Sequence, residues 1–320
     1  MAPNLRYISS DTAALIKFPF SGGQPRNGVE FGPDALVAAG LPEQLESLGW
    51  KVVQDDSIDW DEVNNVARND VSIDTLKNPR SVSLASEKLA AAVEKHAKAG
   101  SLPVTLGGDH SLGIGSMIGV ARAHPGAAVI WVDAHSDINT PNTTPSGNLH
   151  GCPVAFALGL DGAYMAPFKD WLPNPPVNSP NRLVYIGLRD VDEGERKILK
   201  DLNIKVFSMH HVDKYGIGKV VDMALDHINN NTNRRDRPIH LSFDVDAMDP
   251  TVAPSTGTPV RGGLTFREGH YICEALYETG ALVAMDMVEV NPMLEPKCAE
   301  ATIAVGCSLV RAGLGESLLC

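Results

Sequence analysis

The residues of this chain with the clearest chemical potential are aspartates and histidines at short, regular spacing. Asp133-Ala134-His135-Ser136-Asp137 places three such side chains at alternate positions, which point to the same side of an extended segment. Asp244-Val245-Asp246 repeats the pattern, and His110 follows Gly107-Gly108-Asp109. Carboxylates and imidazoles in such clusters bind divalent cations. We predict that one site is formed by His110, Asp133, His135, Asp137, Asp244 and Asp246.

The charge of this group indicates two metal ions. Four clustered aspartates bring four negative charges, which would repel one another and take up protons if no cation were bound. Two divalent ions balance them, and ions about 3.5–4 Å apart are typical of hydrolytic pairs that activate a water. Oxygen and nitrogen ligands without sulfur favour Mn²⁺ and tolerate Co²⁺, Fe²⁺ or Zn²⁺. We therefore expect two Mn²⁺ per chain.

Other interpretations of single motifs were weighed against this one. A lone aspartate at a strand end is more often a helix cap or a turn residue, and we assign Asp109 and Asp249 to such structural roles. Gly113-Ile114-Gly115 with Gly119 resembles a dinucleotide-binding loop, but its spacing differs from G-x-G-x-x-G. We interpret these glycines as sites of close helix packing, with a nucleotide site as the alternative.

The elements that would position these side chains are short apolar strands alternating with helices. Ser86–Lys98 is the clearest helical pattern, followed by the similar ranges 190–202 and 219–229. Alternation of this kind predicts βαβ units and a parallel sheet covered on both faces. The predicted strands cover residues 103–106, 129–132, 183–186, 239–243 and 282–285. The Pro- and Asn-rich range 172–182 is interpreted as a surface loop, so residues 1–320 form one α/β domain.

Most of the chemistry-bearing residues follow the ends of predicted strands. His110, Asp133, Asp244 and Glu289 each come at or shortly after the end of an apolar run. Ligands of open parallel sheets bind beyond the carboxyl ends of the strands. The sequence thus predicts that four strand ends contribute to one site.

Composition excludes several classes of function. The chain has 320 residues and a net charge of -12, which disfavours binding to nucleic acid and to anionic membranes. No apolar run approaches the ~20 residues that span a bilayer, and no secretory signal is recognisable at the start. Five widely spaced cysteines fit a reducing compartment without disulfides. We expect a cytoplasmic protein.

Several longer motifs resemble the arginases of the ureohydrolase family. The three metal motifs are Gly107-Gly108-Asp109-His110-Ser111, Asp133-Ala134-His135-Ser136-Asp137 and Ser242-Phe243-Asp244-Val245-Asp246. The arginase-like segments are Asn139-Thr140-Pro141, Ser146-Gly147-Asn148-Leu149-His150-Gly151, Gly187-Leu188-Arg189-Asp190-Val191-Asp192, Gly257-Thr258-Pro259 and Glu289-Val290-Asn291-Pro292. The resemblance runs from about Gly22 to about Val310, and the combined motifs are highly specific.

This resemblance implies a fold, a reaction and a ligand set. The fold would be a parallel eight-stranded sheet flanked by helices, commonly assembled as a homotrimer. The reaction would be the manganese-dependent hydrolysis of L-arginine to L-ornithine and urea. One ion would take His110, Asp133, Asp137 and Asp244, and the other Asp133, His135, Asp244 and Asp246, with Asp133 and Asp244 bridging. A hydroxide shared by the ions would attack the guanidinium carbon.

The resemblance also implies roles for residues around the metals. His150 would protonate the leaving amine, and Glu289 would lie against the guanidinium; these two and the ligand Asp137 form the expected catalytic group. Asn139 and Ser146 would meet the α-carboxylate, Asp192 the α-amino group, and Thr258 would lie beside the metals. Two positions depart from the usual pattern: Ser136 replaces a frequent Thr, and Cys152 replaces a larger side chain.

Two alternatives belong to other substrates or another class of function. An agmatinase or guanidinobutyrase would share the metal motifs. Agmatine has no carboxylate for Asn139 and Ser146 to meet, and with guanidinobutyrate Asp192 would lose its amino partner. A catalytically silent metal-binding relative would usually lack a ligand, and all six are present here.

Overall fold

The computed structural model describes residues 5–230 and 235–317. Within these residues, eight strands form one parallel sheet in the order β2-β1-β3-β8-β7-β4-β5-β6. The strands are β1 (Thr12–Phe18), β2 (Lys51–Asp55), β3 (Leu102–Gly107), β4 (Ala128–Val132), β5 (Leu183–Leu188), β6 (Lys205–Ser208), β7 (Ile239–Asp244) and β8 (Leu282–Val288). The predicted α/β fold with a parallel sheet is confirmed.

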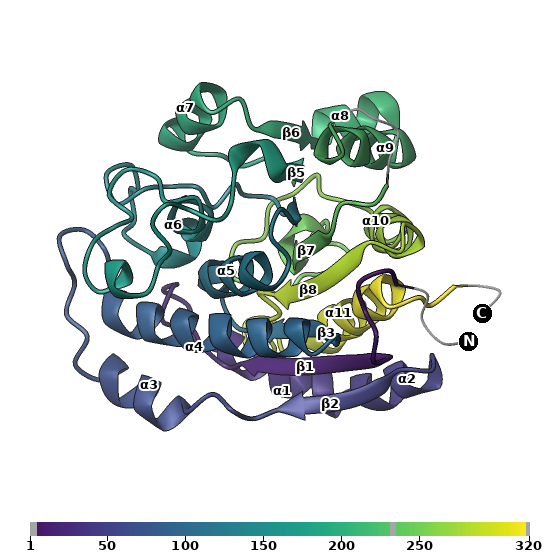
Figure 1. Cartoon of the computed structure of the whole chain (residues 1–320), viewed down its shortest axis with the longest axis horizontal. Helices are drawn as coiled ribbons and strands as arrows, with labels where there is room; N and C mark the ends of the chain where they lie inside the picture. The colour runs from purple at the N-terminus through teal and green to yellow at the C-terminus, as the bar shows by residue number, and fades with distance from the viewer. Residues whose placement is uncertain (1–4, 231–234, 318–320) are drawn as a thin grey trace.

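Helices cover both faces of the sheet (Figure 1). They are α1 (Gly32–Ala38), α2 (Leu41–Ser47), α3 (Trp60–Ala67), α4 (Pro79–Lys98), α5 (Gly113–Ala123), α6 (Pro153–Ala157), α7 (Glu193–Asp201), α8 (Met209–Tyr215), α9 (Ile217–Ile228), α10 (Phe266–Glu278) and α11 (Ala299–Gly313). Residues of α3, α4 and α5 pack on one side, and residues of α1, α2, α9, α10 and α11 on the other. Burial of both faces explains why the inner strands are almost continuously apolar.

All five predicted strands are present, but the sheet has three more. The strands β1, β2 and β6 were not predicted. β2 and β6 are the edge strands, and each is short and partly exposed, so neither carries a run of buried apolar residues. The three predicted helices are present, but each begins at another residue than predicted. α7 begins at Glu193 rather than Asp190, because Asp192 caps it in a capping box with Glu195.

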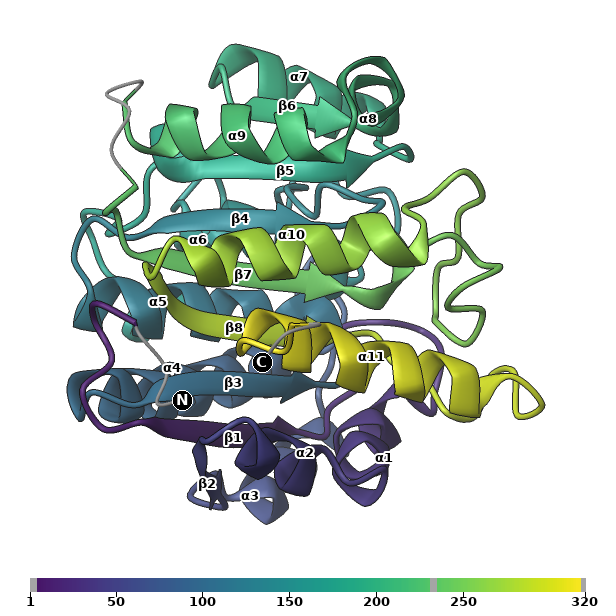
Figure 2. The same ribbon diagram turned by 90° about the vertical axis from the view of Figure 1, so that its right-hand side faces the viewer.

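The four central strands supply the predicted site. β3, β8, β7 and β4 are neighbours in the sheet, and His110, Glu289, Asp244 and Asp133 follow or end them. Because every strand is parallel, their carboxyl ends meet at one edge, to which the arrowheads of β3 and β7 point in Figure 2. The topology therefore gathers residues that lie as much as 179 positions apart, the separation of His110 and Glu289.

The glycines of α5 serve helix packing, as predicted. A Cβ atom on Gly115 would lie 2.4 Å from the Ser86 carbonyl oxygen, and one on Gly119 would lie 2.6 Å from that of Ala90. Both contacts are with α4, so only glycine lets the two helix backbones approach this closely. The nucleotide interpretation has no further support.

Three histidines outside the predicted site lie away from solvent. His270 is 5% exposed, and its ring contacts the Phe266 carbonyl oxygen and the Ser308 hydroxyl. His96 is largely buried and paired with Asp55. His240 lies fully buried in β7.

Two negative findings concern the described residues alone. No described helix combines the length and the apolar character that crossing a bilayer requires. Cys152, Cys273, Cys298 and Cys307 are free thiols, whereas Cys320 lies outside the described residues.

Candidate metal centre

The segment after β4 is bent rather than extended. Residues 133–135 form a bend, and Asp137 adopts a left-handed backbone conformation with φ of 49°. The predicted extended segment is therefore wrong, although the structure still brings the three side chains close together. The bend and the turn at Asp137, rather than strand alternation, direct the three side chains to one place.

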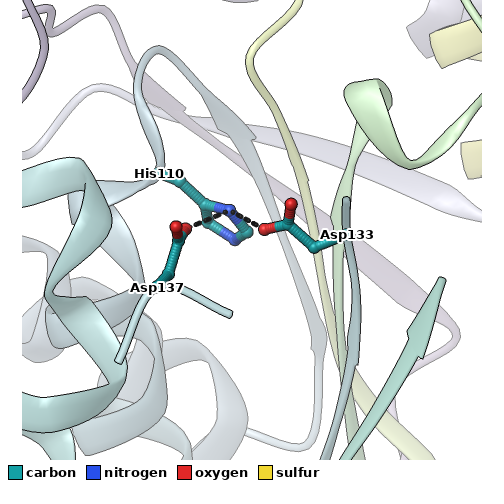
Figure 3. Close-up of side chains that lie close together, drawn as sticks. All are labelled: His110, Asp133 and Asp137. Carbon is teal, nitrogen blue, oxygen red and sulfur yellow. Dashed lines mark ion pairs between the residues drawn. The ribbon is translucent and has the colours of Figure 1, made fainter. Parts of the chain in front are cut away.

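The first cluster surrounds one nitrogen of His110. His110 Nδ1 lies 3.1 Å from Asp133 Oδ2, 3.2 Å from Asp137 Oδ2 and 3.2 Å from Asp244 Oδ2. Figure 3 shows the ring between the first two carboxylates, with the ion pairs as dashed lines. All four side chains are less than one-tenth exposed. The donor atoms of His110, Asp133 and Asp137 are close enough to hold one metal ion.

The second cluster shares a carboxylate with the first. His135 Nδ1 lies 3.4 Å from Asp133 Oδ1 and 3.2 Å from Asp246 Oδ2, and these three residues form the second group that could hold an ion. Asp133 thus directs Oδ2 toward His110 and Oδ1 toward His135. If each cluster held a cation, Asp133 would offer one oxygen to each of them.

The donor chemistry at His110 fits a cation. His110 Nδ1 is buried and forms no well-oriented hydrogen bond with any described residue, although three carboxylate oxygens surround it. Its other nitrogen, Nε2, lies 3.0 Å from Ser242 Oγ. A buried polar atom without a partner is unfavourable, and a metal ion bound to Nδ1 and the surrounding oxygens would satisfy it.

The remaining predicted residues, except Glu289, line a pocket of about 130 Å³ that also contains His135, Asp137 and Asp244. Thr258 donates a hydrogen bond to Asp246 Oδ2 at 2.8 Å. Asn139 Nδ2 donates to Asp192 Oδ2 at 2.8 Å. The lining residues are His135, Asp137, Asn139, Thr144, Ser146, His150, Gly151, Asp192, Glu195, Asp244 and Thr258. The structure thus brings four of the five predicted substrate-binding residues, all but Glu289, into one pocket with three of the predicted metal ligands.

His150 and Glu289 form a pair at the pocket. His150 Nδ1 lies 3.5 Å from Glu289 Oε1, and the same oxygen accepts a hydrogen bond from the His110 backbone at 2.9 Å. Glu289 is not at a helix start: it follows β8 with a left-handed φ of 62°, and its Oε2 has no hydrogen-bond partner among the described residues. Burial lowers the pKa of His150, but Glu289 outweighs this effect and the net pKa is raised. The raised pKa favours the protonated form of the imidazole.

Glu195 and Thr144 line the pocket but were missed by sequence reasoning. Glu195 accepts hydrogen bonds from the backbone N–H groups of Ile138 and Asp192, and burial raises its pKa to about 7. Glu195 therefore connects the loop that carries Asn139 to Asp192, the residue that caps α7. The capping box Asp192-x-x-Glu195 was the available signal.

Trp131 was also missed, since its position inside β4 indicated only a core residue. Its ring stacks on that of His110, with centroids 4.0 Å apart and planes at 10°. Its Nε1 donates to Asp133 Oδ2 at 2.9 Å. One buried side chain thus orients two of the predicted ligands.

The two positions that depart from the expected pattern are both buried. Cys152 lies against the Asn148 carbonyl oxygen at 3.7 Å, and burial raises the pKa of its thiol, so the reactive thiolate is disfavoured. The Ser136 side chain is fully buried.

Comparison with known proteins decides the family. The family model described as "Arginase family" matches residues 11–315. The chain belongs to the arginase family. An arginase of Glaciozyma antarctica is 58% identical over 311 residues, covering 96% of this chain and 89% of the relative.

Solved structures agree with this membership. The crystal structure of a cold-adapted arginase from Glaciozyma antarctica aligns with a TM-score of 0.78 and 50% identity, covering 99% of this chain and 100% of that one. The crystal structure of Entamoeba histolytica arginase in complex with L-ornithine aligns with a TM-score of 0.82 and 29% identity. The alignment covers 97% of this chain and 100% of that one. The arginase fold predicted from the motifs is confirmed.

Protonation of this arginase-family cluster predicts how metal affinity depends on pH. Burial, followed by the charge of Asp133, raises the pKa of Asp137 to about 6. Burial lowers the pKa of His110, but Asp133, Asp137 and Asp244 outweigh it and the net pKa is raised. Both groups must lose their proton to bind a metal ion. We expect Mn²⁺ binding to release protons, and its affinity to fall as pH drops from about 7 to 5, by about tenfold per pH unit for each proton displaced.

Calorimetric titration in buffers of different ionisation enthalpy measures this proton release. Binding that releases no protons and has the same affinity at pH 5 and pH 7 would contradict the assignment of these residues as ligands.

Proposed function

We propose that this chain is an arginase that hydrolyses L-arginine to L-ornithine and urea with two Mn²⁺ ions. The observation that carries the proposal is the pair of clusters that share Asp133 at the base of a pocket in an arginase-family fold. The proposal is supported by relatives that are named arginase and align over nearly the whole chain.

The metal ligands of the proposal are those predicted from the motifs. His110, Asp133, Asp137 and Asp244 would hold one ion, and Asp133, His135, Asp244 and Asp246 the other. Four aspartates balance two divalent charges, and the lack of sulfur donors favours Mn²⁺. When bound, the two ions supply Lewis acidity and lower the pKa of water, so that a nucleophile is available near neutral pH.

The protein itself supplies charge and protons to the guanidinium. Glu289 is buried, and its Oε2 has no partner among the described residues. We assign it to the cationic guanidinium, which would satisfy that atom. His150 lies beside Glu289, and its raised pKa suits a donor of the proton that the leaving amine requires. Asp137 contributes as a metal ligand next to this pair.

The amino-acid end of the substrate would meet the opposite wall of the pocket. Asn139 and Ser146 offer neutral donors for the α-carboxylate, and Asp192 is an exposed carboxylate for the α-amino group. Thr258 joins this wall to Asp246. The complex of the Entamoeba relative with L-ornithine supports a site for an amino acid with an α-carboxylate and an α-amino group.

Replacing Asp192 tests the proposed contact with the amino group. Asp192→Asn should raise KM for L-arginine about tenfold while changing kcat less, because it removes an ion pair that is present in both the ground state and the transition state. Steady-state urea release measures both constants. Asp222→Asn is the matched control, since Asp222 lies exposed on α9 and does not line the pocket. An unchanged KM for Asp192→Asn would remove this residue from substrate binding.

Urea release across three substrates tests the function as a whole. The metal-stripped chain, given Mn²⁺, should produce urea from L-arginine in preference to agmatine and guanidinobutyrate. Preference for either of the latter would establish another ureohydrolase. Two bound ions without hydrolysis of any of the three would establish a catalytically silent relative.

Three finer proposals accompany this function. We infer from the resemblance that residues 1–320 act as one catalytic domain, that three copies assemble as a homotrimer and that the enzyme works in the cytoplasm. Light scattering on the purified chain measures the assembly, and a monomer would contradict the trimer.

A further inference from the structure

A buried chain of hydrogen bonds links His110 to a carboxylate that the pocket does not contain. Behind the metal clusters, His110 Nε2 lies 3.0 Å from Ser242 Oγ, and Ser242 donates to Asp286 Oδ2 at 3.1 Å. Ser242 and Asp286 are register partners on β7 and β8, and both are at most 1% exposed. None of the reaction steps described above uses Asp286.

Asp286 collects three donors on one oxygen. Besides Ser242, Ser116 Oγ donates to Oδ2 at 2.7 Å and His240 Nε2 lies 2.8 Å from it. An ionised carboxylate is an acceptor only, so each of these neighbours must direct a proton toward Asp286. For Ser242, this uses the single proton of the hydroxyl.

This direction determines the tautomer of His110. With its proton given to Asp286, the Ser242 oxygen can only accept a hydrogen bond from His110, whose Nε2 must then carry hydrogen. The neutral ring therefore has its lone pair on Nδ1, which faces the oxygens of Asp133, Asp137 and Asp244. The opposite tautomer would direct an N–H bond at the position where an ion would be held.

We propose that Asp286 is a positioning residue that acts through Ser242 to select the metal-binding tautomer of His110. The stacked ring of Trp131 holds the plane of the imidazole, and the chain from Asp286 determines which nitrogen carries the hydrogen. Hydrogen-bond partners of this kind commonly affect metal affinity by about 10–100-fold. The inference rests on the proposed function in one respect, namely that the clusters bind cations.

Asp286→Asn removes the charge that holds the Ser242 proton while keeping the shape of the side chain. With the amide nitrogen toward Ser242, the serine proton turns to His110 Nε2 and favours hydrogen on Nδ1. With the amide oxygen there, a neutral acceptor holds that proton less strongly. Mn²⁺ titration of the full, EDTA-stripped chain, with free Mn²⁺ measured by electron paramagnetic resonance, should show at least one of two dissociation constants weakened by about 10–100-fold. Ser242→Ala removes the link itself and should weaken the same constant.

Ser116→Ala is the matched control. It removes a donor to the same oxygen of Asp286 but leaves the path from Asp286 to His110 intact. Both constants should stay within about threefold of wild type, since this loss affects folding stability rather than the tautomer. Thermal unfolding of each metal-stripped variant measures the structural cost separately from metal affinity.

Loss of affinity in Ser242→Ala and in folded Asp286→Asn, but not in Ser116→Ala, would support the proposal. Unchanged constants in Ser242→Ala would overturn it, even if Asp286→Asn does not fold. Equal weakening in Ser116→Ala would also overturn it, because a general disturbance of the core would then explain the effect. A wild-type chain that binds no Mn²⁺ would instead reject the metal centre itself.

Discussion

Asp133→Asn should remove at least one of the two metal ions and lower urea release from L-arginine by about a thousandfold, since metal ions contribute several kcal/mol of transition-state stabilisation. The amide has the shape of the carboxylate but only one oxygen. It can serve the position near His110 or the one near His135, which Asp133 approaches with different oxygens, but not both. Elemental analysis after dialysis measures the ions, and a urea assay measures the rate.

The control for this substitution is Asp222→Asn. Asp222 is an exposed carboxylate on α9 that belongs to neither cluster and does not line the pocket. It should retain two ions and the wild-type rate. Two ions bound to Asp133→Asn with wild-type affinity would refute the bridging role of Asp133.

The sequence predicted the site best where metal-binding side chains directly follow the ends of strands. The motifs around His110, Asp133 and Asp244 follow or end strongly apolar strands, and parallel pairing brings such ends together. The convergence of the six predicted ligand side chains was therefore predictable before the order of the strands was known. The edge strands β2 and β6 were not, because partial exposure leaves them without an apolar run.

Backbone conformation and distant partners limited the prediction of the site. Nothing local to the motif indicates that Asp137 adopts a positive φ, and this turn replaces the extended geometry that was assumed. The hydrogen bond between Ser242 and Asp286 joins two neighbouring strands through residues that are 44 positions apart in the sequence. A buried aspartate within an apolar strand was a visible anomaly, but its partner depends on the register of the sheet.

The pairing of His150 with Glu289 shows how one oxygen can serve two purposes. Glu289 Oε1 accepts from the His110 backbone and lies near His150 Nδ1, so the same carboxylate fixes the turn that carries a predicted ligand and raises the pKa of the proposed proton donor. A change at Glu289 would therefore disturb both the metals and proton transfer. A change at His150 separates them, because His150 is not among the groups that could hold a metal ion.

His150→Ala should retain both ions and lower kcat by about 10²–10⁴-fold, which is the usual contribution of a positioned acid or base. The truncation leaves the backbone bond from His150 N–H to the Gly23 carbonyl oxygen in place, so the loop should keep its course. Added imidazole should restore part of the rate if the missing group is a proton donor. His124→Ala is the control, since His124 is also partly buried but lies at the end of α5, and it should keep the wild-type rate. A His150→Ala variant with normal kcat would exclude the role in proton transfer, whereas one that loses metal would show that His150 supports the cluster instead.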